Sequence, residues 1–182
     1  MRPIYVYGSA VLRQVAKEIT PDYPNLKGLI AEMWESMEKS DGVGLAAPQI
    51  GLSIRLFVVD AGAFVAEYPE AEGFRKAFIN AHILEYGAET MPFNEGCLSV
   101  PGIHGDVVRP TSIRISYCDE AFVQHEETFT GIVARIIQHE YDHIEGKLFV
   151  DHFTGIKRRM VQTKLRNIER GKFSADYPCR LE

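Results

Sequence analysis

Hydrophobic residues recur with helical spacing in the segment that begins at Leu26. They follow the i, i+3, i+4, i+7 series of an amphipathic helix that buries one face. Asn25, directly before the series, belongs to a residue type that commonly caps the start of a helix. The pattern predicts a helix that ends near Gly42, because glycine often follows a helix C-terminus. The apolar positions are Leu26, Leu29, Ile30, Met33, Trp34 and Met37.

The middle of the chain has the composition of β-strands. Short segments rich in β-branched and aromatic residues are separated by turn residues, as expected for strands. In one of them Ile113, Ile115 and Tyr117 alternate with polar residues, which favours a half-buried antiparallel strand. Residues 61–75 interrupt the series and predict a connection with some helical character. The predicted strands are Arg55–Asp60, Lys76–Asn80, Ile83–Tyr86, Ile113–Cys118 and Phe122–Phe129.

Two further helices are predicted in the C-terminal part. One spans Ile132–Glu145, and the other spans Ile156–Arg170 within a C-terminal helical segment at 154–171, followed by a tail at 172–182. Strands that precede helices, without regular alternation, favour the α+β class. We therefore expect mostly antiparallel strands around a central helix, with an N-terminal and a C-terminal helix. The length fits one catalytic domain over 1–182.

Composition narrows the functional classes. The chain has 46% hydrophobic and 25% charged residues, as in ordinary globular proteins. Its net charge of −5 argues against a protein that mainly binds nucleic acid, so no DNA partner is expected. No uninterrupted apolar segment reaches about 18 residues, so we expect no membrane partner and a cytoplasmic location. The three cysteines are too irregularly spaced to predict a disulfide framework.

The second predicted helix carries an H-E-x-x-H motif. His139 and His143 are four residues apart, so both can reach one metal ion from the same helical face. Glu140 projects beside that face, where it can take a proton from a metal-activated water. The preceding turns are strongly apolar, so the helix is expected in the core. The motif therefore predicts a metal-dependent hydrolase.

A catalytic metal site usually has three protein ligands, and the spacing leaves the third one open. A metzincin would need a histidine where Phe149 stands, so that pattern fails. Glu169 is the downstream glutamate that a thermolysin-like site would use, but it falls in a helix with a surface pattern. A thiolate is the other alternative, and spacing alone does not choose among Cys97, Cys118 and Cys179.

Three segments, taken in order, resemble the three signature motifs of the peptide deformylases. They are Gly42-Val43-Gly44-Leu45-Ala46-Ala47-Pro48-Gln49, Glu95-Gly96-Cys97-Leu98-Ser99 and Gln138-His139-Glu140-Tyr141-Asp142-His143-Ile144-Glu145-Gly146. The resemblance spans about residues 4–172. The sequence departs from the family pattern at Ile144, where leucine is usual, and in residues 61–75, which look longer than in many members.

The resemblance implies removal of the formyl group from the N-terminal N-formylmethionine of nascent polypeptides, with release of formate. It implies one divalent metal ion, Fe²⁺ in the cell, with Zn²⁺ or another divalent ion possible in purified protein. The implied roles are metal ligation by Cys97, His139 and His143, proton transfer by Glu140, oxyanion stabilisation by Gln49 and the backbone N–H of Leu98, and contact with the peptide backbone at Gly44 and Gly96.

An apolar pocket beside the metal would select methionine. Ile136 and Ile132 precede His139 on the same helical face, and Val43 can close the opposite side. Arg135 also falls on this face and is expected at the rim, where its charge can reach water. Glycines at the first motif allow the close backbone approach that a small formyl group needs.

The last predicted helix is strongly basic. Seven Lys and Arg residues but only one acid, Glu169, lie between Lys157 and Lys172. Such a run of charge is usually a solvated face. The family resemblance implies a different role, docking on the ribosome near the tunnel exit with ribosomal RNA as the partner. His82, His104, His125 and His152 are expected to be surface or hydrogen-bonding residues. Two rival functions remain at this point: a zinc endopeptidase of another class, and a non-enzymatic metal-binding module.

Overall fold

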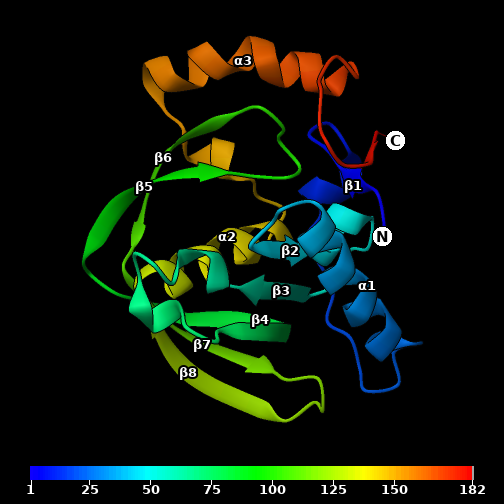
Figure 1. Cartoon of the computed structure of the whole chain (residues 1–182), viewed down its shortest axis with the longest axis vertical. Helices are drawn as coiled ribbons and strands as arrows, with labels where there is room; N and C mark the ends of the chain where they lie inside the picture. The colour runs from blue at the N-terminus through cyan, green and yellow to red at the C-terminus, as the bar shows by residue number, and fades with distance from the viewer. Residues whose placement is uncertain (182) are drawn as a thin grey trace.

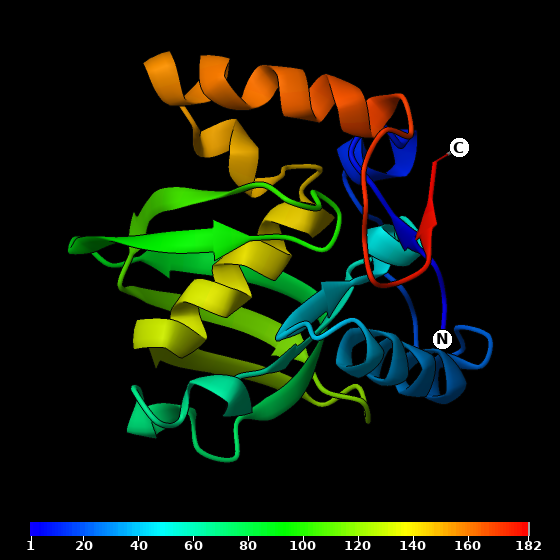
Figure 2. The same cartoon turned by 45° about the horizontal axis from the view of Figure 1, so that its top comes forward.

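The computed structural model describes residues 1–181 and combines helices with mostly antiparallel strands (Figures 1 and 2). This confirms the α+β class. The helices begin and end close to the predicted positions, and α1 and α2 each have a clear apolar face. They are α1 (Leu26–Lys39), α2 (Gly131–Ile144) and α3 (Gly155–Glu169).

The largest sheet has five antiparallel strands. Its strand order is β2-β3-β4-β7-β8, and α2 lies across one of its faces (Figure 2). The hairpin of β5 (Thr90–Gly96) and β6 (His104–Pro110) lies on the other side of α2. The sheet strands are β2 (Gly44–Ala46), β3 (Leu56–Asp60), β4 (Arg75–Tyr86), β7 (Ser112–Cys118) and β8 (Gln124–Thr130).

The sequence prediction divided β4 wrongly into two strands, Lys76–Asn80 and Ile83–Tyr86. The structure has one strand with two shifts of register against β7, and Asn80 adopts a positive φ of 52° at the first of them. A bulge of this kind breaks the alternation of buried and exposed residues without ending the strand. Because the bulge interrupts the hydrophobic alternation, the sequence pattern predicted a turn at this point of β4.

Buried side chains on the two faces of β3 join α2 and α1 to the same sheet. Phe57 and Val59 pack in the cluster that includes the apolar face of α2, whereas Leu56 and Val58 pack with α1. All four are fully buried. Because successive strand residues point to opposite faces, this short strand fixes both helices relative to each other.

Asn25 does not cap α1 as predicted. It adopts a left-handed conformation with φ 50°, and its side chain makes no capping hydrogen bond. Asparagine tolerates this region better than most residues. Asn25 therefore acts through its backbone conformation, which turns the chain into the helix.

The segment predicted as a tail, 172–182, contains a short strand, and its residue 182 lies outside the described residues. β9 (Cys179–Arg180) pairs in parallel with β1 (Ile4–Tyr5), so a segment near each end of the chain lies beside the other (Figure 2). The connection at residues 61–75 contains two short 3₁₀ turns, in agreement with its predicted helical character. Within residues 1–181, none of the helices has the length and apolar character needed to cross a membrane.

Candidate active site

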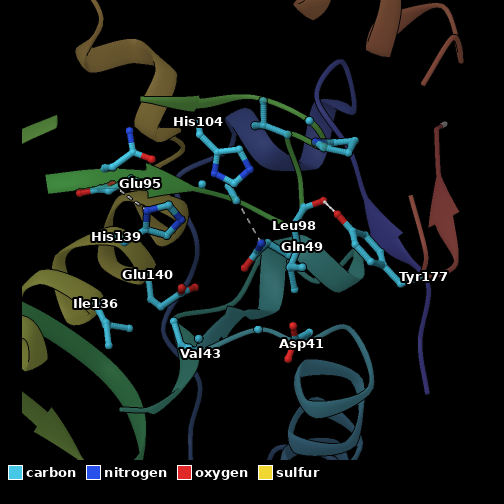
Figure 3. A pocket seen from close by; sticks show the side chains of 18 of the residues that line it. Asp41, Val43, Gln49, Glu95, Leu98, His104, Ile136, His139, Glu140 and Tyr177 are labelled. Carbon is cyan, nitrogen blue, oxygen red and sulfur yellow. Dashed lines mark hydrogen bonds and ion pairs between the residues drawn. The ribbon is translucent and has the colours of Figure 1, made fainter. Parts of the chain in front are cut away.

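Three separate segments meet at one pocket, which Figure 3 shows from close by. The first is the start of β2 with the 3₁₀ turn Ala47–Ile50 that follows it. The second is the end of β5 and the loop after it, and the third is the middle of α2. These are the three segments that carried the family resemblance. The fold therefore brings together residues that are far apart in the sequence.

Cys97, His139 and His143 form a cluster that fits a metal ion. Their potential ligand atoms all lie within 4.8 Å of one another. Sγ of Cys97 is 3.2 Å from Nε2 of His143. Two ligands of one tetrahedral zinc-like ion are separated by roughly 3.5 Å, so this spacing suits coordination. One thiolate and two imidazoles are a donor set for a divalent transition metal, and they do not distinguish iron from zinc.

Glu95 orients the first histidine of this cluster. Its Oε2 lies 2.9 Å from Nδ1 of His139. When Nδ1 carries the proton that this hydrogen bond needs, Nε2 keeps its lone pair free for a metal. No role was predicted for Glu95 from the sequence, although the residue lies within the second motif. The general need of a ligating histidine for a carboxylate partner was the signal that could have identified it.

Two buried arginines hold the carboxylate of Glu95. Nε and Nη2 of Arg109 donate to its two oxygens at 2.7 and 3.0 Å, and Nη1 of Arg135 donates to Oε1 at 3.0 Å. Burial alone would raise the pKa of Glu95, but hydrogen bonds from His139 and Arg109 lower it well below the usual value. Arg109 also donates to Asp142 of α2 at 2.7 Å. Glu95 is therefore a fixed anion.

The prediction that Arg135 lies at the rim with its charge in water is wrong. Its side chain is buried, and it donates to the backbone carbonyls of Val107 and Met91 as well as to Glu95. A buried guanidinium requires such partners because the desolvated charge is costly. Arg135 still contributes to the pocket lining, but it supports Glu95 from within the protein.

Glu140 is a buried carboxyl group without a hydrogen-bond partner at its buried oxygen in the part of the chain that the structure describes. Only 4% of the residue is exposed, and among residues 1–181 its Oε2 has no hydrogen-bond partner. Burial raises the pKa of Glu140 to about 7. A carboxyl group with a pKa near neutrality can both accept and return a proton. In Figure 3 its carboxylate points into the pocket.

The Gln49 side chain is held with its amide nitrogen toward the cysteine. Its Oε1 accepts the backbone N–H of Ala46 at 2.8 Å, which fixes the orientation of the amide. Nε2 then lies 3.6 Å from Sγ of Cys97 and 3.2 Å from Oγ of Ser99. Leu98 lines the same pocket. An amide donor is therefore presented beside the metal-ligand cluster.

The pocket has a volume of about 450 Å³, within the usual range for small-ligand sites. Ile132 and Ile136 of α2 line it, and so does Val43, as predicted. Phe64 and Phe93 also line it and were not predicted from the sequence. Phe64 comes from the connection at residues 61–75, so this segment closes the apolar part of the pocket.

Gly44 and Gly96 both line the pocket. At each position the absence of a Cβ also leaves space for a neighbouring side chain. A Cβ on Gly44 would lie 2.7 Å from Cδ of Glu140, and one on Gly96 would lie 2.5 Å from Cε1 of His104. Distances of this kind do not occur without movement of a neighbour. The two glycines therefore leave room for protein groups, in addition to the predicted contact with a peptide.

The remaining histidines and cysteines lie outside the cluster. His82, His125 and His152 bond to carboxylates, as expected. His104 is exposed, as expected, but it also lines the pocket from β6, where it pairs with Gly96. Cys118 in β7 and Cys179 in β9 are half-buried free thiols, each packed against a hydrophobic cluster.

Comparison with known proteins agrees with this geometry. The family model described as polypeptide deformylase matches residues 1–159. A peptide deformylase of Flavobacterium johnsoniae is 50% identical over 98% of this chain and 95% of its own length. A Plasmodium falciparum peptide deformylase structure is 36% identical, with a TM-score of 0.80 over 92% of this chain and 99% of that one. For the Thermotoga maritima enzyme the identity is 41% and the TM-score 0.77, over 85% and 99% of the two chains. The chain described here therefore belongs to the polypeptide deformylase family.

Proposed function

We propose that the cluster of Cys97, His139 and His143 is the metal centre of this deformylase and that chain 1–182 acts as one catalytic domain. The observation that carries the proposal is the convergence of one thiol and two imidazoles within 4.8 Å, beside an acid with an unpartnered oxygen. A divalent ion held there supplies Lewis-acid chemistry that makes water nucleophilic at neutral pH.

The residues around this centre have distinct roles in hydrolysis of the formyl amide. Glu140 accepts the proton of the attacking water and passes it to the amine nitrogen as the C–N bond breaks. Nε2 of Gln49 and the backbone N–H of Leu98 donate to the formyl oxygen while negative charge develops on it. Glu95 keeps His139 in the tautomer that binds a metal.

The apolar part of the pocket binds the methionine side chain. Ile132 and Ile136 form one wall and Val43 the opposite one, and a long flexible thioether suits such a surface. Gly44 and Gly96 contact the peptide backbone. Arg135 contributes indirectly by holding Glu95.

Formate release from formyl-Met-Ala-Ser tests the proposed centre. We expect wild-type turnover and loss of both bound metal and activity in Cys97→Ala, with Cys118→Ala unchanged in both. Full metal content in Cys97→Ala would contradict the assignment of the thiol ligand. Family membership disfavours the two rivals, and the same assay separates them: an endopeptidase would cleave internal bonds, and a metal-binding module would release nothing.

We propose Fe²⁺ as the ion used in the cell, which we place in the cytoplasm with nascent polypeptides. A ferrous centre with a thiolate ligand is oxidised in air. Protein purified without oxygen should contain iron and lose activity on exposure to air, whereas zinc-reconstituted protein should keep its own activity. Unchanged activity and metal content after aerobic handling would contradict iron.

We also propose that α3 docks on the ribosome. Its exposed basic residues include Arg159 and Lys164, on an otherwise acidic protein. Arg159→Glu/Lys164→Glu should reduce co-sedimentation with ribosomes and weaken its dependence on salt. Lys27→Glu/Lys147→Glu, which changes two exposed lysines outside α3, is the matched control. Equal retention of both variants would contradict the docking role.

A further inference from the structure

The loop that follows β5 forms a tight turn within the active site. The backbone N–H of Val100 donates to the carbonyl of Cys97 at 2.9 Å, which makes residues 97–100 a β-turn. Its two central residues are Leu98, whose N–H is one of the proposed oxyanion donors, and Ser99. The hydrogen bond that closes the turn leaves the central peptide, between Leu98 and Ser99, without a partner inside the turn. The orientation of this peptide therefore depends on contacts with other segments.

Segments near the two ends of the chain supply such contacts. The N–H of Tyr7, two residues after β1, donates to the carbonyl of Ser99 at 2.7 Å. Oη of Tyr177, two residues before β9, donates to the carbonyl of Leu98 at 2.8 Å, and Figure 3 shows the two groups facing each other. Because β1 and β9 pair, one small sheet carries both tyrosines. Two successive carbonyls of the turn are thus attached to this sheet.

Of these two contacts, only the one from Tyr177 uses a side chain. The tyrosine is half-buried and packs against the same hydrophobic cluster as Leu98. Burial raises the pKa of its phenol, so the hydroxyl keeps the proton that it donates. Tyr177 also lies beyond residues 1–159, which the family model matches. The C-terminal segment therefore adds a contact to the catalytic turn that the three motifs do not contain.

The same turn also supports the second proposed oxyanion donor. Oγ of Ser99 lies 3.2 Å from Nε2 of Gln49, and Ser99 is fully buried. Rotation of the central peptide would move Ser99 and with it the group that this amide contacts. Oxyanion donors are effective when they already point to the place where negative charge will develop. A loss of alignment therefore slows the reaction even when both donors remain.

We propose that Tyr177 is a positioning residue for deformylation, whose hydroxyl fixes the central peptide of the turn at residues 97–100 and thereby aligns the two oxyanion donors. The inference rests on the proposed function, since the roles of Leu98 and Gln49 come from there. Tyr177 acts through the backbone of the turn and not on the reacting atoms. Loss of its hydroxyl should consequently affect the chemical step more than substrate binding.

Tyr177→Phe tests the proposal, because it removes the hydroxyl and keeps the ring that lines the pocket. With formyl-Met-Ala-Ser, kcat should fall by about threefold to tenfold, less than the 10² to 10³ expected when a donor is removed, since both donors remain. KM should stay within about twofold of wild type, and the metal content should be unchanged. Tyr23→Phe is the matched control, since it removes the hydroxyl of another half-buried tyrosine packed against the same cluster.

Three outcomes would overturn the positioning role. The first is a kcat in Tyr177→Phe equal to that of Tyr23→Phe. The second is a higher KM at unchanged kcat, which would make Tyr177 a residue that binds the peptide. The third is loss of metal, which would mean that Tyr177 supports the thiol ligand Cys97 and not the oxyanion donors.

A double-mutant cycle with Ser99→Ala provides a second measurement. Ser99→Ala removes the hydroxyl that Nε2 of Gln49 contacts. If Tyr177 acts through the turn, Tyr177→Phe should reduce kcat by a smaller factor in the Ser99→Ala background than in wild type, because the two changes disturb the same alignment. Effects that multiply fully would overturn the proposal. All rates are compared well below the Tm of each variant, so that a difference in stability does not enter them.

The wild-type protein in the same assay keeps this inference separate from the proposed function. Normal formate release by wild type, together with an unchanged kcat in Tyr177→Phe, would contradict the positioning role and leave the metal centre standing. Absence of formate release by wild type would contradict the proposed function itself.

Discussion

The carboxylate of Glu95 lies 2.9 Å from Nδ1 of His139, and it is itself held by the guanidinium groups of Arg109 and Arg135. Glu95 stands two residues before Cys97, at the end of β5, whereas His139 lies on α2. The end of β5 therefore positions two groups: the candidate metal ligand Cys97, and Glu95, which orients the second candidate ligand, His139. This links the geometry of the β5–β6 hairpin directly to the metal centre.

Glu95→Gln should lower metal affinity by about tenfold to a hundredfold, the usual effect of removing a carboxylate that orients a ligating histidine. It should also destabilise the fold, because Arg109 would keep its buried charge without its strongest partner. Competition titration with a chelator measures the first effect and thermal unfolding the second. Glu127→Gln, a hydrogen-bonded acid on β8, serves as control. Metal affinity within twofold of wild type would contradict the role of Glu95.

Gly44→Ala should reduce kcat while the metal content stays normal. The added Cβ would lie 2.7 Å from Cδ of Glu140 and would displace its carboxylate. Misplacing a general acid–base group costs about 10² to 10⁴ in rate. Gly62→Ala is a suitable control, because its Cβ would have a single neighbour, Oδ1 of Asp60 at 3.0 Å. Normal kcat in Gly44→Ala would show that Glu140 tolerates displacement and is not the proton acceptor.

The sequence predicted the parts of this fold whose burial follows a regular period. α1 and α2 have apolar stripes, and β7 alternates cleanly, so their positions were confirmed. The β5–β6 hairpin was missed. β5 is largely exposed, and the buried positions of β6 are taken by Gly105, Val107 and Arg109, which show no hydrophobic alternation.

Only the part of the candidate site that lies within one local motif could be predicted from spacing. The spacing of His139 and His143 indicated a metal, whereas the choice of Cys97 came from the family resemblance. Glu95, Arg109 and Tyr177 were missed because their roles depend on contacts between distant segments. Arg135 was misplaced because helical periodicity gives the face of a residue but not the partners that allow a charge to be buried.

Gln49 offers a way to separate oxyanion stabilisation from local structure. Gln49→Glu keeps an oxygen that can accept the N–H of Ala46 but removes the Nε2 donor, whereas Gln49→Leu removes both. Both variants should lose about 10² to 10³ in kcat, as for removal of one oxyanion-hole donor. Gln49→Leu should also lower Tm, since it leaves a buried backbone N–H unpaired. Wild-type kcat in Gln49→Glu would contradict the role of the amide donor.

Removal of the metal should lower thermal stability as well as activity. Cys97 follows β5 and the two histidines lie on α2, so a bound ion connects the hairpin to the central helix. An ion that binds only the folded state stabilises it by about 2.7 kcal/mol at a free concentration of 100 times Kd. Wild-type protein and Cys118→Ala should therefore show a Tm that falls on chelation and recovers when metal is restored. Cys97→Ala should show a Tm that is insensitive to both treatments, and a full chelation response in that variant would mean that the stabilising ion is bound elsewhere.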